Sequence, residues 1–482
     1  MNTTLKNIIA VTNCAILSLA LPACKTPNPS PAGDVQVPAY PVTGLETTAY
    51  TVLASEKQVP VFDLWASGIH EKKKPIPKAY LAQFGLQGET TVTIVTEKPF
   101  SKATVRPMSE SISLRVDAAK RQITVKMKGP QTLQVILDED AGHLLNLCAV
   151  AITPPPKPDS QTMYFAPGLH TMGFVNIVKD DTSIYLAPGA VVRGWFNAQK
   201  VKNLSIRGSG ILINDLQKNG AFVDVNQFLI DGPTLINLMD TWSLVPTACE
   251  HVTIRNLRLL SRTRDGVDIN GCKNLLLEKS FILSLDDCVC LKGTRHAKQW
   301  PNTDIVVKDL VLAGTGAGNV IDFGHESKSE GWRNILFSDI RIILSHYYLE
   351  PSNYIGLYPT APLSIHLIDD VPLQDVTFRN ILIEGNKKSF NVDLRIFRNA
   401  HAYTAYKEPS GYAPKASITG VLFENIEFRE GVDVPSTIKG FSESSSIRQV
   451  RFKNLIINGK KITDSRSGGF NVGPFADQPL FE

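Results

Sequence analysis

The feature that most limits the fold of this chain is a nine-residue pattern that recurs seven times in its second half. Apolar and variable residues alternate on both sides of a polar corner that carries Asn, Asp or Ser. The copies are VTIRNLRLL (252–260), LLLEKSFIL (275–283), IVVKDLVLA (305–313), ILFSDIRII (335–343), VTFRNILIE (376–384), VLFENIEFR (421–429) and VRFKNLIIN (450–458). The corner residues Asn256, Ser280, Asp309, Asp339, Asn380, Asn425 and Asn454 follow one another by 24, 29, 30, 41, 45 and 29 residues. Such a period is typical of stacked supersecondary units.

Each copy predicts two short strands around a bend, because the alternation has a period of two and no amphipathic helix lies between copies. Units of this kind bury their apolar faces only by stacking in parallel, which predicts a right-handed parallel β-helix over residues 161–482. The polar corner favours a ladder of side chains that hydrogen-bond along the stack. The LxxLxLxxN motif of leucine-rich repeats is missing and a propeller needs four strands per unit, so both architectures are excluded.

The first half of the chain has a different pattern. Short alternating runs, such as TTVTIVT (90–96) and QITVKMK (122–128), are separated by turn residues and predict a small N-terminal β-sandwich domain over residues 47–153. Residues 154–160 contain three consecutive prolines and predict a stiff linker. The chain is therefore expected to be all-β.

The N-terminal segment indicates export. Residues 1–24 combine a basic start with an apolar stretch too short to span a membrane, which needs about 20 residues, and they predict a signal peptide. The sequence Leu-Pro-Ala-Cys at 21–24 is similar to a bacterial lipobox, which implies lipidation of Cys24; because the proline is unusual there, simple secretion is the alternative. Residues 25–46 are rich in Pro and Ser and predict a tether. We expect a lipid anchor in the bacterial cell envelope, in the periplasm or outer membrane.

Composition excludes several classes of protein. With 43% hydrophobic residues the chain is not disordered, and a net charge of +4 gives no reason to expect nucleic acid as a partner. The nine histidines do not cluster, so we predict no metal site and no cofactor. Five cysteines remain after residue 24, an odd number that does not indicate a disulfide framework. We expect a monomer whose partner is a polysaccharide.

Three carboxylates are the strongest functional signal. Asp265 and Asp286 are separated by 21 residues, about one coil of the solenoid, and Asp287 follows directly. Hydrolysis of a polysaccharide needs one protonated acid and one carboxylate base, and crowded like charges raise a carboxyl pKa. The alternative is that Asp-Gly and Asp-Asp occupy exposed turns. The one-coil register favours a catalytic site.

These residues also carry a resemblance to a known family. TRDGVD (263–268) and DDCV (286–289) resemble the core pattern of glycoside hydrolase family 28, the polygalacturonases, and the similarity extends over roughly residues 160–460. It implies an inverting hydrolase of the pectin class in which Asp286 is the general acid while Asp265 and Asp287 hold and activate water. A β-sandwich ahead of the β-helix also resembles the dextranases of family 49, which share the carboxylate trio.

The sequence departs from the family-28 pattern in two places. The Gly-His-Gly of the next coil would fall at 316–318, where the histidine is missing; His325 and Glu326 follow shortly and are predicted to contact the sugar, with a surface salt bridge as the alternative. The Arg-Ile-Lys that recognises galacturonate has its nearest matches at Arg341 and Arg395, each without the lysine. A neutral glucan or galactan is therefore also possible.

Three further residues complete the predicted substrate site. Lys292 is a candidate for binding an acidic sugar, and Trp242 for stacking against a sugar ring. Asp268 is a candidate sugar contact or a structural cap for its turn. Solvation of the lysine and packing of the tryptophan under loops are the alternatives.

Two other functional classes fit this fold. A non-catalytic carbohydrate-binding β-helix would not be expected to carry an acidic trio in one-coil register. A polysaccharide lyase would need calcium or a basic cluster near one coil, and no convincing cluster is found. We therefore expect an exported glycoside hydrolase.

Overall fold

The computed structural model describes residues 33–41, 44–64, 78–108, 112–140, 143–156, 161–216, 218–293, 300–316, 318–345, 360–397, 413–430 and 434–482. These residues form strands and turns and contain no helix. It follows that no helix within these ranges is long and apolar enough to cross a membrane. Cys24 and the predicted signal peptide lie outside the described residues.

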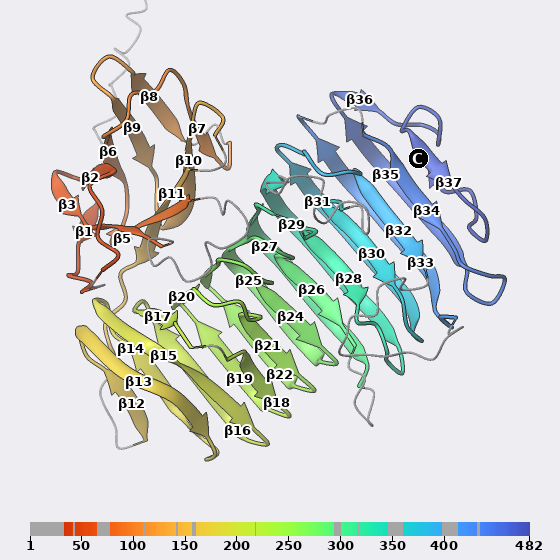
Figure 1. The fold of residues 1–482 in the computed structure, drawn as a ribbon, viewed down its shortest axis with the longest axis horizontal. Helices are drawn as coiled ribbons and strands as arrows, with labels where there is room; N and C mark the ends of the chain where they lie inside the picture. The colour runs from red at the N-terminus through yellow and green to blue at the C-terminus, as the bar shows by residue number, and fades with distance from the viewer. Residues whose placement is uncertain are drawn as a thin grey trace, which may run out of the picture.

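Strands β1 to β11 form two sheets beside the first coils of the β-helix (Figure 1). One sheet has the order β1–β5–β11–β10–β7 with β4 beside β5, and the other has the order β3–β2–β6–β9–β8. The first contains β1 (Asp34–Gln36), β4 (Val61–Asp63), β5 (Lys78–Gln87), β7 (Ala103–Arg106), β10 (Gln131–Leu137) and β11 (His143–Ala151). The second contains β2 (Tyr50–Ala54), β3 (Lys57–Val59), β6 (Thr90–Thr96), β8 (Ser113–Asp117) and β9 (Gln122–Met127). One apolar cluster with members from both sheets forms their shared core.

Strand β5 lacks the alternation that marks the other runs of this region. Its residues do not alternate, because both faces of the strand are covered. Ala82 and Phe84 belong to the core between the two sheets, whereas Ala79 and Leu81 belong to a cluster shared with the β-helix. The chain also forms a strand earlier than expected, since Asp34–Gln36, inside the predicted tether, pair with β5.

Strands β12 to β38 form a single 27-stranded sheet that winds from the yellow coils to the blue coils of Figure 1. The bounds of its first part are β12 (Thr162–Phe165), β13 (Gly168–Ile177), β14 (Ser183–Leu186), β15 (Ala190–Gln199), β16 (Lys202–Gly208), β17 (Ile211–Asn214), β18 (Gly220–Val223), β19 (Asn226–Asp231), β20 (Thr234–Asn237), β21 (Leu244–Thr247), β22 (Glu250–Arg255), β23 (Arg258–Ser261), β24 (Val267–Asn270) and β25 (Lys273–Ser284). Those of its second part are β26 (Val289–Lys292), β27 (Asn302–Gly314), β28 (Ile321–His325), β29 (Trp332–Ser345), β30 (Leu363–Leu367), β31 (Pro372–Ile383), β32 (Val392–Ile396), β33 (Ser417–Phe428), β34 (Ser436–Lys439), β35 (Ile447–Ile457), β36 (Lys460–Lys461), β37 (Phe470–Val472) and β38 (Leu480–Phe481).

The coils have three faces. The first face contains β14, β16, β19, β22 and the first halves of the long strands β25, β27, β29, β31, β33 and β35. The second face contains β17, β20, β23 and the second halves of those long strands. The third face contains β18, β21, β24, β26, β28, β30, β32 and β34. Strands stack in parallel along each face.

The bend between the first and second faces is formed by the repeated polar corner. Its residues have positive φ values from 49° to 59°, a region that Asn and Asp tolerate better than other side chains. Hydrogen bonds join Asn380 to Asp339, Asn425 to Asn380 and Asn454 to Asn425 at 2.9, 2.9 and 3.0 Å, which is the predicted ladder. One corner was misplaced by a residue: Lys279, not Ser280, adopts the positive φ. The Ser280 hydroxyl instead accepts a hydrogen bond from the Leu257 amide at 3.1 Å.

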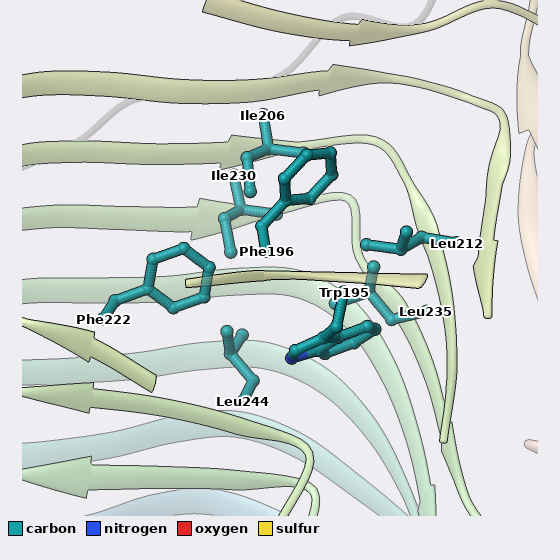
Figure 2. A pocket seen from close by; sticks show the side chains of 8 residues that line it. All are labelled: Trp195, Phe196, Ile206, Leu212, Phe222, Ile230, Leu235 and Leu244. Atoms are coloured by element: carbon teal, nitrogen blue, oxygen red, sulfur yellow. The ribbon is translucent and has the colours of Figure 1, made fainter. Parts of the chain in front are cut away.

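The interior of the β-helix is apolar along its length. Phe337, Phe378, Phe423 and Phe452 stack from coil to coil with ring centroids 5.5, 4.9 and 4.7 Å apart. In the first coils, Trp195, Phe196 and six aliphatic or aromatic neighbours surround a void of about 10 Å³ (Figure 2). A void this small with an apolar lining is not a ligand site.

The N-terminal sheets pack against the second face. Leu81 and Leu144 share a buried cluster with Ile213 and Leu260 of the β-helix. A buried amide crosses the same contact, because Gln83 donates to the Ser209 carbonyl at 2.9 Å and accepts from the Thr234 hydroxyl at 2.5 Å. Among the described residues, no strand of the third face contributes to this cluster.

Candidate active site

The three predicted carboxylates lie where the chain turns from the second face onto the third. Val267 of β24 pairs with Val289 of β26, so one coil is 22 residues long here and Asp265 is level with Asp287. Gly266 makes the close approach of these coils possible, because a Cβ atom there would lie 2.5 Å from the Cys288 carbonyl oxygen. Carboxylate oxygens of Asp265, Asp286 and Asp287 all lie within 4.8 Å of one another. The structure thus brings the predicted trio together.

The members of the trio differ in exposure. Asp265 and Asp287 are buried, with 2% and 6% of their surface accessible. Asp286 has 34% of its side-chain surface exposed. Asp286 is therefore the carboxyl of the trio that a bound molecule reaches first.

A buried lysine lies within the acidic group. The Lys292 ammonium is 3.2 Å from Asp265, 3.2 Å from Glu326 and 3.7 Å from Asp268. It also lies 5.1 Å from the centroid of the Trp242 ring. We predicted Lys292 as a cation for an acidic sugar, but its charge is shared among three carboxylates and its side chain is only 7% exposed. Its position is that of an internal counter-ion.

Crowding and burial set the protonation of this group. Burial, and then the charge of Asp265, raise the pKa of Asp286 to about 7. The same two causes hold the pKa of Asp287 and of Asp268 well above the ordinary value. Burial opposes the charge of Lys292, yet the surrounding carboxylates hold its pKa well above the usual range. The site can therefore supply a protonated carboxyl near neutral pH beside a paired carboxylate.

The other predicted residues fall at two distances from the trio. Glu326, Trp242 and Asp268 are joined to it through Lys292. Asp268 is fully buried on β24, with its carboxylate 3.7 Å from the Lys292 ammonium. His325 lies on the next coil, where its ring is 5.3 Å from that of His366.

Neither arginine proposed for galacturonate recognition offers a free charge. Arg341 lies away from the third face, 3.7 Å from Glu384. The Glu384 carboxylate also lies 3.6 Å from Arg106, a residue of the N-terminal sheets. Arg395 does lie on the third face, where its Nε donates to Asp393 at 2.7 Å. Both guanidinium groups are already paired with carboxylates.

Several supporting residues were not found from the sequence. The Asn319 amide donates to Asp287 at 2.7 Å, and Gly318 leaves room for Asp286, whose Oδ1 would lie 2.5 Å from a Cβ atom there. Lys388, from the turn after β31, donates to the Gly316 carbonyl, and burial lowers its pKa to about 8. No local motif marks these residues, because distant coils bring them together.

A serine shapes the turn that carries the acidic pair. The Ser284 hydroxyl lies 3.0 Å from the Arg264 carbonyl and 2.8 and 2.9 Å from those of Asp286 and Asp287. Arg264 in turn places its guanidinium 3.9 Å from Asp286. These contacts fix the backbone on which the trio stands.

A separate cleft of about 630 Å³ lies between the N-terminal sheets and the β-helix. Its lining includes Thr132 and Val150 on one side and Arg207 and Arg258 on the other, and it contains none of the trio. The candidate active site is therefore not this cleft.

Comparisons with known proteins agree with the fold. No protein-family model matches the sequence, and no curated protein matches it. Among solved structures, Dex49A from Penicillium minioluteum is similar with a TM-score of 0.63 at 14% identity, over 93% of this chain and 96% of that one. The polygalacturonase of Erwinia carotovora ssp. carotovora gives 0.47 at 14% identity over 69% and 99% of the two chains. The exopolygalacturonase of Thermotoga maritima gives 0.44 at 15% over 62% and 85%. The likeness to Dex49A confirms the predicted right-handed parallel β-helix.

Proposed function

We propose that this protein is a glycoside hydrolase that cleaves a polysaccharide on its third face. The observation that carries the proposal is the trio itself: one half-exposed carboxyl with a pKa near 7 beside two buried ones and a buried lysine. Raised carboxyl pKa values in such a cluster are typical of catalytic sites. A purely structural set of charges would not stack acids on adjacent coils, because like charges repel.

Each carboxylate has a distinct role in this proposal. Asp286 is protonated near neutral pH and donates its proton to the leaving glycosidic oxygen. Asp265, held against the Lys292 ammonium at 3.2 Å, is the base that takes a proton from water. Asp287, fixed by the Asn319 amide at 2.7 Å, holds that water. The proton of Asp286 thus passes to the leaving oxygen, and the proton of the attacking water passes to Asp265.

Inversion at the anomeric carbon is proposed from the resemblance to family 28. Carboxyl spacing does not support it independently, since oxygens within 4.8 Å are closer than the separations of about 6.5–9.5 Å usual for inverting pairs. In this scheme the water lies between Asp265 and Asp287 rather than across a wide gap. Proton NMR of a fresh digest should show the inverted anomer first, and a retained anomer would refute the mechanism.

A neutral glucan of the dextran class is the favoured substrate. Lys292 and Arg395 are paired with carboxylates. Two further cations beside the trio are also engaged, Arg264 with Asp240 at 2.6 Å and Lys388 with the Gly316 carbonyl. A polygalacturonate would have to break these pairs or bind without a counter-charge. The resemblance to the family-49 dextranases, with strands ahead of a β-helix and the same carboxylate trio, supports the same choice.

The test is release of reducing ends from dextran, a neutral galactan, polygalacturonate and rhamnogalacturonan. We expect activity on dextran that falls by about 10²–10⁴-fold in Asp286→Asn, the usual contribution of a general acid. Asp309→Asn, a change at a corner far from the trio, is the matched control and should keep full activity. Full activity of Asp286→Asn would refute the assignment of the acid.

The same panel separates the alternatives. Activity on polygalacturonate alone would overturn the choice of a neutral glucan while keeping the hydrolase. An unsaturated product, detected by its ultraviolet absorbance, would indicate a lyase. Binding to a polymer without cleavage would favour a carbohydrate-binding β-helix.

We also propose that the protein is exported and anchored through a lipid on Cys24. The support is the short apolar segment followed by Leu-Pro-Ala-Cys. Radiolabelled palmitate should enter the wild-type protein and not Cys24→Ala. No labelling of either protein would favour simple secretion, and equal labelling of both would place the lipid on another residue.

A further inference from the structure

A second cluster of metal-ligating side chains lies one coil beyond the trio. Asp322 and His325 belong to β28, and His366 belongs to β30, the next strand of the third face. One carboxylate oxygen and one ring nitrogen from each histidine all lie within 4.8 Å of one another. The reaction proposed above uses none of these three residues.

Two residues of this cluster carry buried atoms without a hydrogen-bond partner. Asp322 and His366 are 0% and 1% exposed, and among the described residues Oδ2 of Asp322 and Nδ1 of His366 have no hydrogen-bond partner. Burial of an unpaired polar atom is costly unless something binds it. Two such atoms in one cluster are a stronger signal than either alone.

The tautomer of His366 leaves the lone pair of Nδ1 beside a carboxylate. Its Nε2 lies 2.9 Å from Asp393, so this nitrogen carries the proton and donates it to the carboxylate. Nδ1 then presents a lone pair toward Asp322 Oδ1, only 3.5 Å away. A lone pair and an anion repel each other at this distance, so a cation between them would stabilise both.

The spacing and the surroundings suit a zinc ion. Zinc–nitrogen bonds of about 2.0–2.1 Å in a tetrahedral site place neighbouring ligand atoms about 3.3 Å apart, close to the 3.5 Å seen here. The hydrogen bond from His366 to Asp393 is the carboxylate–histidine contact that orients metal-binding histidines. Ser364 holds Asp322 in place through a 2.6 Å hydrogen bond to Oδ1, the oxygen that lies 3.5 Å from His366 Nδ1.

An apolar wall and an opening complete the site. The Phe397 ring meets the rings of His325 and His366 edge-on, with centroids 5.9 Å from each. His325 is partly exposed, which gives the ion a path from solvent. We propose that Asp322, His325 and His366 bind a divalent transition-metal ion, Zn²⁺, that joins two coils beside the active site.

The rival explanation is a protonated His366 held between two carboxylates. In that case the chain would need no ion, and Asp322 and Asp393 would simply share the charge of the imidazolium. The two explanations differ in stoichiometry, because only the first predicts one zinc per chain.

The experiment uses the full chain without a polyhistidine tag, stripped with a chelator and then dialysed against Zn²⁺. We expect one equivalent of zinc by elemental analysis, and visible d–d absorption typical of nitrogen and oxygen ligands when Co²⁺ replaces it. Asp322→Asn and His366→Gln should lose the ion. Asp393→Asn should weaken binding by about 10–100-fold, as for other orienting partners.

Two controls locate the ion. His170→Gln removes a partly exposed histidine of β13 and should bind zinc like the wild type. Asp286→Asn should also keep the ion, which shows that the acidic trio does not hold it. If the buried variants fail to fold, His325→Gln at the partly exposed position gives the same reading. A wild-type chain that retains no stoichiometric zinc, or zinc binding unchanged in Asp322→Asn, would overturn the proposal.

Discussion

Two columns of outward-facing side chains run along the β-helix and differ in how their charges are arranged. On the first face, Arg207, Asp231, Arg255, Glu278 and Lys308 stand on successive coils in exact alternation of sign. Arg255 meets Asp231 at 2.8 Å, and Lys308 meets Glu278 at 3.4 Å. Each coil therefore compensates the charge of its neighbour.

On the third face, acidic residues lie on neighbouring coils without a cation between them in the same column. Asp268 on β24 and Asp322 on β28 are separated along their column only by Cys290, and Asp265 is level with Asp287. Burial of like charges costs stability that the first face avoids. Both faces have the same backbone. The difference therefore indicates that the charges of the first face stabilise the stack, whereas those of the third face serve catalysis.

The largest test of this comparison replaces one lysine on each face. Lys292→Met leaves Asp265, Asp268 and Glu326 without their counter-ion, and loss of one partner of a buried pair costs about 3–5 kcal/mol. Lys308→Met breaks only an exposed pair and should cost about 0–1 kcal/mol.

Urea unfolding of both variants measures the difference in the free energy of unfolding. A further variant, Lys292→Arg, keeps the charge and should recover part of the lost stability. Equal effects of the two methionine substitutions would show that the third face is no more dependent on its cation than the first.

The pH profile of activity is the next test. Asp286 must be protonated to act as the acid, so kcat/KM should fall as the pH rises through about 7. The charges that face Asp286 are Asp265, Arg264, Lys292 and Lys388. Arg264 favours the ionised carboxyl, and Arg264→Gln should move the alkaline limb to higher pH. An alkaline limb that is unchanged in Arg264→Gln would contradict the role of Asp286.

The same shift predicts the direction of a stability change. The pKa of Asp286 in the folded chain lies above its value in the unfolded chain, so between about pH 4 and 7 the folded chain binds more protons. Stability from this group is present at low pH and is lost as the pH rises through 7. Asp286→Asn should therefore raise the thermal midpoint more at pH 8 than at pH 5.

The repeats were predictable because their signal is local. Asn380, Asn425 and Asn454 each stand in the same nine-residue context, and the positive φ of the corner favours asparagine wherever it occurs. At one corner the prediction was off by one residue, because Lys279 rather than Ser280 has the positive φ. Strand β5 carries no such local signal, since burial on both faces removes the alternation.

The site was only partly predictable because its parts come from different coils. Asp265, Asp286 and Asp287 fall within one coil length, so spacing alone could connect them. The Lys292 side chain was visible in the sequence, but its role was not, because the position of Glu326 depends on how long the intervening loop is. His366 carries no motif and becomes significant only through its neighbours on two coils.

Salt concentration provides the smallest and most selective test of the two columns. On the first face, the Glu424 carboxylate forms ion pairs with Arg379 at 2.6 Å and with Lys453 at 2.8 Å. Both cations are about half exposed. Glu424→Gln should lower the thermal midpoint slightly at low ionic strength, and the difference from the wild type should vanish in 1 M NaCl, where charges are screened beyond about 3 Å. The loss in Lys292→Met should persist in the same salt, because its pairs are buried away from the ions. If salt removed both losses alike, the third-face charges would be as open to solvent as those of the first face. That result would contradict the proposed difference between stabilising charges on the first face and buried catalytic charges on the third.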